Sequence, residues 1–189
     1  MGSSSESPLD IELIEKLSEL PTKEISQRVY RATAKLADPI TFSRNGGRWA
    51  PPANILEIPA LYTSFEPDGA KREISSYLGL LTPPPSRQFV VHEIELSARS
   101  VITLDMQTLQ GLGVERTAYS GRDYAPLGSS PASLTQRIGA GVSFLEHDGL
   151  VVPSARFDCW NLILYGNNHH PDSVLEVVQT EEFDWKVYS

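Results

Sequence analysis

The residues best suited to chemistry in this sequence are an arginine, a tyrosine and a glutamate: Arg48, Tyr62 and Glu73. Arg48 belongs to residues 46–49 (Gly-Gly-Arg-Trp), and glycine lets the backbone take positive φ and approach a ligand closely. A guanidinium group binds phosphates and carboxylates in a planar, bidentate geometry. The stretch from 44 to 73 therefore predicts a site for an anionic ligand. Taken singly, each residue also has an ordinary interpretation: a solvated arginine, a core phenol and a solvated acid.

Three predicted elements position these side chains. The loop that carries Arg48 is followed by two prolines, which keep the chain extended. The apolar run 58–64 predicts a buried strand, and this strand carries Tyr62. A helix at 67–81 follows, with Glu73 between its apolar row and solvent. That row consists of Ala70, Ile74, Tyr77, Leu78 and Leu81.

Hydrophobic periodicity and turn residues predict most other elements. Further strands are expected at 25–32, 88–96, 101–104, 150–153, 160–165 and 174–179. Helices are expected at 8–20 and 105–110. Segment 111–130 is rich in Gly, Ser, Pro and Tyr and is expected to form a surface loop. The irregular mixture of strands and helices indicates an α+β fold, with mixed or antiparallel sheets flanked by helices, rather than a doubly wound sheet.

Another helix is expected directly after this loop. Ser130 and Pro131 are the residue types preferred as N-cap and first helical residue, and Gly149 is placed to end the helix. Its apolar row consists of Leu134, Ile138, Val142 and Leu145. Ser133 is expected in the first turn, where unpaired backbone N–H groups and the helix dipole favour an anion.

The totals indicate one ordinary globular domain. Of the 189 residues, 25–189 are expected to form the domain and 1–24 a polar tail and a helix. The net charge of −8 disfavours direct binding of nucleic acid. No signal peptide is visible and no apolar run is long enough to span a membrane, so a cytoplasmic protein is expected. The single cysteine rules out an internal disulfide.

Motifs for metal binding and for other kinds of catalysis are weak. His169 and His170 are adjacent, whereas two ligands on one helix face need a spacing of three or four, so no metal site is predicted. The sequence contains no glycine-rich nucleotide motif and no nucleophile elbow. A Ser/His/Asp triad stays open, since its members need not be close in sequence.

Six motifs, in this order, resemble the RES domain family, which is named for its Arg, Glu and Ser. They are 29–31 (Val-Tyr-Arg), 46–49, 60–62 (Ala-Leu-Tyr), Glu73, Ser133 and 149–155 (Gly-Leu-Val-Val-Pro-Ser-Ala). The resemblance covers residues 29–165. In one departure, Ala32 follows the first arginine, where some relatives have a tyrosine that stacks or hydrogen-bonds.

The resemblance implies a fold like that of ADP-ribosyltransferase toxins and an enzyme whose substrate is NAD. It implies the toxin of a bacterial toxin–antitoxin pair. Some members hydrolyse or phosphorolyse NAD, and others transfer ADP-ribose to a protein. The expected partner is a helix-turn-helix antitoxin whose C-terminal part covers the active site, so that any contact with DNA runs through the antitoxin.

The matched motifs carry functional roles to five positions of this sequence. Arg31 and Arg48 can clamp the pyrophosphate of NAD from separate elements. Tyr62 can stack on nicotinamide or hydrogen-bond a ribose. Glu73 can stabilise the oxocarbenium ion that forms as the nicotinamide–ribose bond breaks, or hold the ribose 2′-OH. Ser133 can bind phosphate or the nicotinamide ribose. The catalytic candidates are therefore Glu73, Ser133 and Arg31, and the candidates for binding NAD are Arg31, Arg48, Tyr62 and Ser133.

Two classes of function stay open. The first is an enzyme that degrades NAD or transfers ADP-ribose, for which segment 111–130, with Tyr119, Arg122 and Tyr124, is a candidate for recognising a protein target. The second is a module that senses NAD or another nucleotide without turnover. Glu73 argues against a sensor, because binding an anion gains nothing from a nearby carboxylate. A DNA-binding regulator is disfavoured by the negative charge and by the absence of a visible recognition helix.

Overall fold

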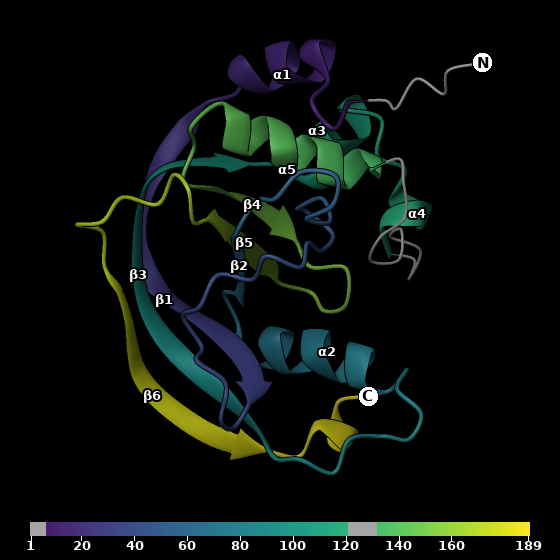
Figure 1. Ribbon diagram of the computed structural model, residues 1–189, viewed down its shortest axis with the longest axis vertical. Coiled ribbons are helices and arrows are strands. Elements are labelled where there is room, and N and C mark those ends of the chain that lie inside the picture. The colour runs from purple at the N-terminus through teal and green to yellow at the C-terminus, as the bar shows by residue number, and fades with distance from the viewer. Residues whose placement is uncertain (1–6, 121–131) are drawn as a thin grey trace.

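A six-stranded mixed sheet forms the frame of the protein, and its long strands curve around helix α2 (Figure 1). The computed structural model describes residues 7–120 and 132–189. The strands are β1 (Thr22–Ala34), β2 (Ala60–Ser64), β3 (Phe89–Thr103), β4 (Gly149–Pro153), β5 (Trp160–Tyr165) and β6 (Leu175–Phe183). The helices are α1 (Ile11–Ser18), α2 (Pro67–Leu78), α3 (Met106–Gly111), α4 (Arg116–Ser120), α5 (Leu134–Phe144) and a 3-10 turn, η1 (Trp185–Val187). This architecture confirms the predicted α+β class.

The strand order is β1-β2-β5-β4-β3-β6, and β1 also pairs with β3. On one edge β3 runs antiparallel to β1, and on the other edge it pairs first with β6 and then with β4, which is parallel. Strand β1 meets β2 where Tyr30 lies opposite Ser64. This junction brings the strand that carries Arg31 beside the strand that carries Tyr62.

The predicted strands 88–96 and 101–104 are one strand, β3, of 15 residues. The polar residues between them suggested a break. Pairing with β1 nevertheless continues there, with Ser97 opposite Ser26. The ladder to a neighbouring strand decides the structure at this point, whereas local composition does not. The other predicted strands are confirmed, with ends that differ by a few residues.

Helix α5 begins later than the sequence predicts. Its N-cap is Ser133, whose hydroxyl accepts a hydrogen bond from Gln136 N at 3.3 Å, while the Gln136 side chain accepts one from Ser133 N at 3.0 Å. This capping box satisfies two backbone N–H groups at once. The prediction of Ser130 as N-cap is therefore wrong, and Ser130 itself lies outside the described residues. The helix ends at Phe144, and Gly149 instead begins β4.

Two other predictions need correction. Tyr77 does not belong to the buried face of α2, because the helix ends one residue later and leaves this side chain 53% exposed. The segment 111–130, predicted as a loop, contains the short helix α4, and its residues from 121 onward lie outside the described part of the chain. Among the described residues, no helix combines the length and the apolar character needed to cross a membrane.

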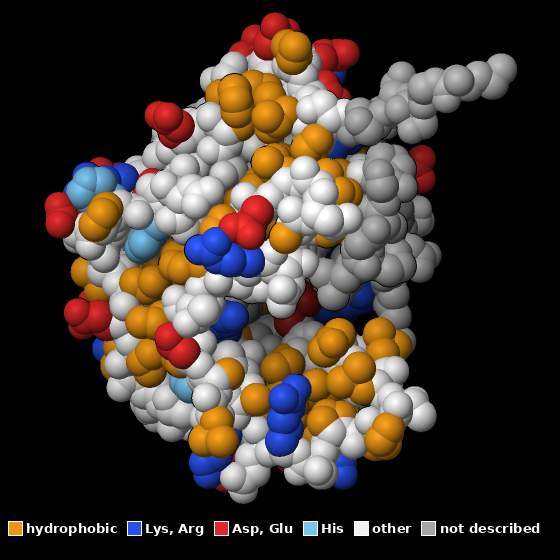
Figure 2. Space-filling model, viewed as in Figure 1, with side chains coloured by type: hydrophobic (Ala, Val, Ile, Leu, Met, Phe, Trp, Pro, Cys, Tyr) orange, Lys and Arg blue, Asp and Glu red, His pale blue; other side chains and the backbone are white. Residues whose placement is uncertain are grey.

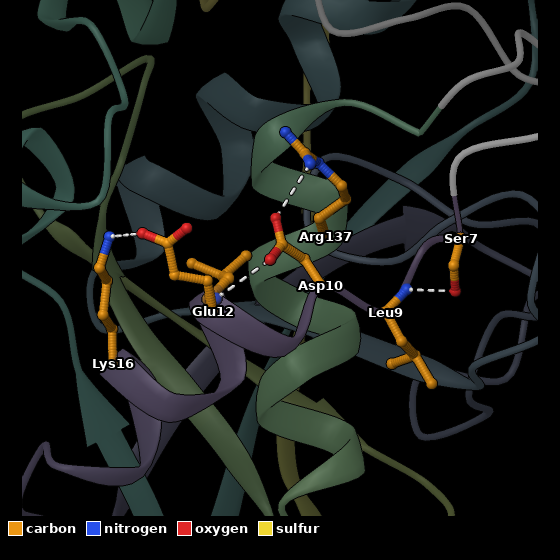
Figure 3. Close-up of polar contacts among 7 residues, drawn as sticks. Ser7, Leu9, Asp10, Glu12, Lys16 and Arg137 are labelled. Carbon is orange, nitrogen blue, oxygen red and sulfur yellow. Dashed lines mark hydrogen bonds and ion pairs between the residues drawn. The ribbon is translucent and has the colours of Figure 1, made fainter. Parts of the chain in front are cut away.

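Helix α1, predicted at 8–20, packs on α5, and one carboxylate ties the two helices together (Figure 3). Asp10 is the N-cap of α1 and accepts a hydrogen bond from Leu13 N at 3.2 Å. The same side chain accepts one from Arg137 Nη1 of α5 at 3.1 Å. Leu13 and Leu17 then enter the core. Asp10 thus fixes both the start of α1 and its position on α5.

One buried and two half-buried histidines make the stability of the protein depend on pH. Burial lowers the pKa of His92, His147 and His169 below the ordinary value of 6.5. For His92, the charge of Arg31 adds to this effect and that of Asp38 opposes it. The unfolded chain then binds protons more readily than the folded one, so this stability is fully present above about pH 6.5 and is lost as the pH falls. We expect Tm to drop between about pH 7.5 and about pH 5.5.

Part of that drop should come from His92. Its two ring nitrogens contact the hydroxyl groups of Thr33 at 2.9 Å and Thr180 at 2.8 Å. In a His92→Gln variant, the decrease in Tm across this pH range should become smaller. The matched control, His170→Gln in the loop before β6, should retain the full decrease. Equal pH dependence of Tm in both variants would contradict the assignment.

Candidate functional site

A cavity of about 190 Å³ lies between β1, β2, β5 and α2. Figure 2 shows a hollow on this face, with basic and acidic side chains within it and hydrophobic side chains along its lower rim. Four of the five functional positions expected from the sequence line this cavity: Arg31, Arg48, Tyr62 and Glu73. Positions on a strand, a loop, a second strand and a helix are therefore brought to one place.

The loop that carries Arg48 is held by the core beneath it. Trp49 is buried, and its carbonyl accepts a hydrogen bond from the Tyr165 hydroxyl at 3.0 Å. Gln136 Nε2 of α5 donates to Gly47 O at 3.0 Å. Arg48 therefore extends from a backbone that is fixed on both sides, and its direction is set by the fold.

Tyr62 packs directly against this loop. Its hydroxyl accepts a hydrogen bond from Trp49 N at 3.1 Å. A Cβ atom at Gly47 would lie 2.6 Å from the Tyr62 hydroxyl, so glycine is required for this approach. Positive φ occurs at Gly46, at 75°, and Gly47 does not share it. The second glycine thus makes room for a side chain of the site.

Arg31 has a structural contact as well as a place in the cavity. Its Nη1 donates to the carbonyl groups of Pro39 at 2.8 Å and Thr41 at 3.1 Å. Burial lowers the pKa of the Arg31 guanidinium, and nearby Asp38 opposes the shift. A guanidinium group carries five N–H donors, and the two described bonds use Nη1 alone. Arg31 can therefore anchor the loop after β1 and still offer donors to an anion.

Two hydrogen-bond donors, from residues distant in the sequence, hold the Glu73 carboxylate. Ser154 Oγ donates to Glu73 Oε1 at 2.7 Å, and Asn161 Nδ2 donates to the same oxygen at 3.0 Å. Ser154 directly follows β4, and Asn161 lies in β5. Among the described residues, no hydrogen-bond donor reaches Oε2. The carboxylate is thus fixed by one oxygen at the wall of the cavity.

Tyr119 of α4 completes the wall beside Arg48. Arg48 Nη1 donates to Tyr119 O at 3.0 Å, and the guanidinium carbon lies 5.3 Å from the centre of the tyrosine ring. The Tyr119 hydroxyl donates to Pro153 O, and burial raises the pKa of this phenol. Tyr119 therefore helps to orient the Arg48 side chain, through both its carbonyl group and its ring. The other two residues considered for target recognition, Arg122 and Tyr124, lie outside the described residues.

Ser133 does not line the cavity. Its hydroxyl accepts from Gln136 N as the N-cap of α5, and Gln136 in turn binds Gly47 of the arginine loop. Ser133 is thus connected to the site through Gln136. Its proposed contact with phosphate or ribose stays a prediction.

The sequence did not indicate that Asn161 belongs to the site, nor that Tyr119 lies in a helix. Ser154 was noted only as part of the motif 149–155. The only sequence signal for Asn161 is a polar residue in the otherwise apolar strand Trp160–Tyr165. Within the described part of the chain, no three His, Cys, Asp or Glu side chains gather as a metal ion would require.

Comparison with known proteins found one family and similar solved structures. The model of the RES domain matches residues 28–186. The crystal structure of the M. tuberculosis MbcT-MbcA toxin-antitoxin complex matches with a TM-score of 0.74 and 22% sequence identity, covering 95% of this chain and 96% of that chain. At this identity, the likeness shows the fold. A comparison with curated proteins returned no match.

Proposed function

The chain belongs to the RES domain family, and from this membership and its cavity we propose that it is a toxin that cleaves the nicotinamide–ribose bond of NAD. The observation that carries the proposal is the position of Glu73. This carboxylate is anchored at the wall of a cavity that is also lined by two arginines and three tyrosines, Tyr62 among them. Such a set suits a ligand with an anionic part and a centre that becomes positive during reaction.

We infer from the size of the cavity which part of NAD would enter it. Ligand pockets commonly enclose roughly 300–1,000 Å³, and this cavity encloses about 190 Å³. We therefore place the nicotinamide and its ribose inside, with Tyr62 beside the ring. The pyrophosphate lies at Arg31 and Arg48, which supply planar donors.

Cleavage then follows from the charges of NAD. The bond between C1′ of the ribose and the nicotinamide nitrogen breaks, and its electron pair leaves with nicotinamide, which becomes neutral. Positive charge develops on C1′ and the ring oxygen, where the Glu73 carboxylate stabilises it. Water, phosphate or a protein side chain attacks C1′ and loses a proton. Each acceptor gives a different product from the same first step.

A sensor that only binds NAD is the alternative function. Its site would need arginines for the pyrophosphate, and a carboxylate nearby would weaken the binding of that anion. Here two donors hold Glu73 in the cavity. The arrangement supports turnover over sensing.

We further propose that a helix-turn-helix antitoxin neutralises the protein by covering this cavity. The structurally similar MbcT-MbcA assembly is a complex of a toxin with its antitoxin. An NAD-consuming enzyme without such a partner would deplete the NAD of its own cell, so both proteins belong in the cytoplasm. DNA would be contacted through the antitoxin.

The test uses the purified protein, free of partner, incubated with NAD that is labelled in its adenosine part. Free NAD and label on protein are followed together, with and without phosphate and with a cell extract. Rapid loss of NAD that depends on phosphate would identify a phosphorylase, and loss without phosphate a glycohydrolase. Label on an extract protein would identify an ADP-ribosyltransferase. Binding of NAD without loss or label would refute the enzyme and leave the sensor.

A further inference from the structure

Asn161 stands in a rigid part of the sheet. Strand β5 lies between β2 and β4, and Asn161 pairs with Ser64 on one side and Val152 on the other. Its backbone is therefore fixed by both neighbouring strands. From this position, its side chain reaches Glu73 on α2, 88 positions earlier in the sequence.

The contact with Glu73 determines which way the Asn161 side chain points. A carboxylate oxygen can only accept a hydrogen bond, so the atom that faces Glu73 Oε1 must be the NH₂ group. Oδ1 must then point elsewhere. It is buried there, and it has no hydrogen-bond partner among the described residues.

A buried acceptor without a partner destabilises the folded state. A branched apolar residue at this position would avoid that penalty, and such residues suit strands better than asparagine. Packing and strand formation alone therefore give no reason for asparagine here. Native proteins retain such local conflicts mainly at functional sites.

Ser154 is the other donor to Glu73, and its contacts show what the hydrogen bond from Asn161 adds. The Ser154 hydroxyl accepts from Arg156 N at 3.1 Å and from Phe157 N at 3.3 Å, so its own proton is left for Glu73 Oε1. One bond of this kind holds an oxygen but lets the carboxylate turn about it. A second donor from β5 limits that rotation and thereby fixes where Oε2 lies.

We propose that Asn161 is a positioning residue, retained at a cost in stability because it orients the Glu73 carboxylate toward the reacting ribose. The inference rests on the proposed cleavage of NAD. It adds that activity and stability are opposed at this position.

The Asn161→Val variant tests whether activity and stability are opposed at this position. The variant removes both the donor to Glu73 and the unpartnered Oδ1, so Tm should stay the same or rise. Because a small misplacement of a catalytic group is costly, kcat for NAD loss should fall on the order of tenfold to a hundredfold. KM should change little, since the groups that bind the pyrophosphate are untouched. A lower Tm, or an unchanged kcat, would overturn the proposal.

Thr103→Val is the matched control. Thr103 is also a strand residue with a buried hydroxyl that lacks a partner among the described residues, and it does not line the cavity. This variant should keep or raise Tm and leave kcat unchanged. A loss of kcat here equal to that of Asn161→Val would remove the special role of Asn161.

Asn161→Asp supplies a readout that a purely structural role would not affect. It places a second carboxylate against Glu73, and two neighbouring carboxylates resist carrying charge together. The acidic limb of the pH–rate profile should therefore move to higher pH, and an unmoved limb would count against positioning. Wild-type turnover is measured first. Its absence would refute the proposed function together with this inference, whereas normal turnover in both Asn161 variants would refute this inference alone.

Discussion

Replacing Glu73 with glutamine is expected to lower kcat for NAD cleavage by roughly 10²–10³-fold, the usual effect of removing one electrostatic stabiliser of a transition state. Glutamine keeps the shape of the side chain, and its carbonyl oxygen can still accept the hydrogen bonds from Ser154 and Asn161. The fold and the affinity for NAD should therefore persist, with Tm and KM close to those of the wild type. What disappears is the negative charge beside the developing oxocarbenium ion.

The measurements are initial rates over a range of NAD concentrations, NAD binding by calorimetry, and thermal unfolding. Glu66→Gln is the matched control, because Glu66 is the exposed N-cap of the same helix and its side chain makes no capping bond. It should keep full activity. If Glu73→Gln retained wild-type kcat, the carboxylate would have no part in bond cleavage.

Gly139→Ala is expected to cause the largest loss of stability, about 3 kcal/mol or more of the free energy of unfolding. A Cβ atom at Gly139 would lie 1.9 Å from Trp49 O and 2.7 Å from the Tyr165 hydroxyl. Both are parts of the structure that fixes the loop carrying Arg48. The backbone of α5 or of that loop must move, so NAD cleavage should fall together with Tm.

Gly111→Ala is the control for this substitution. Gly111 is the last residue of α3, and an added Cβ atom there meets nothing within 4 Å. Alanine also favours helix, so this variant should be neutral or more stable by up to about 1 kcal/mol. Denaturant unfolding compares the two variants. A Gly139→Ala protein as stable as the wild type would show that the loop and α5 are not packed as described.

The sequence was a good guide to the elements that hold Arg31, Arg48, Tyr62 and Glu73. Each of these elements has a strong local signal: a strand pattern, a glycine turn, or a helix after proline. Their gathering in one cavity depends on the β1–β2 junction and on α2 lying inside the curve of the sheet. Local patterns do not encode such an arrangement.

The features that the sequence did not predict correctly, or did not predict at all, depend on competition between local signals or on distant contacts. Ser130 followed by proline and Ser133 followed by Gln136 both indicate a helix start, and the capping box at Ser133 prevails. The anchoring of Glu73 joins it to Ser154 and Asn161, 81 and 88 positions away. Hydrogen bonds over such separations form only once the sheet is in place.

The most direct test of the central claim is the release of nicotinamide from NAD by the purified protein, free of partner. If the cavity cleaves the nicotinamide–ribose bond, chromatography should show one nicotinamide released for each NAD lost, whichever acceptor takes the ADP-ribose. The Glu73→Gln protein should release less than about a hundredth as much in the same time. Intact NAD after prolonged incubation with a folded protein that binds it would contradict the claim.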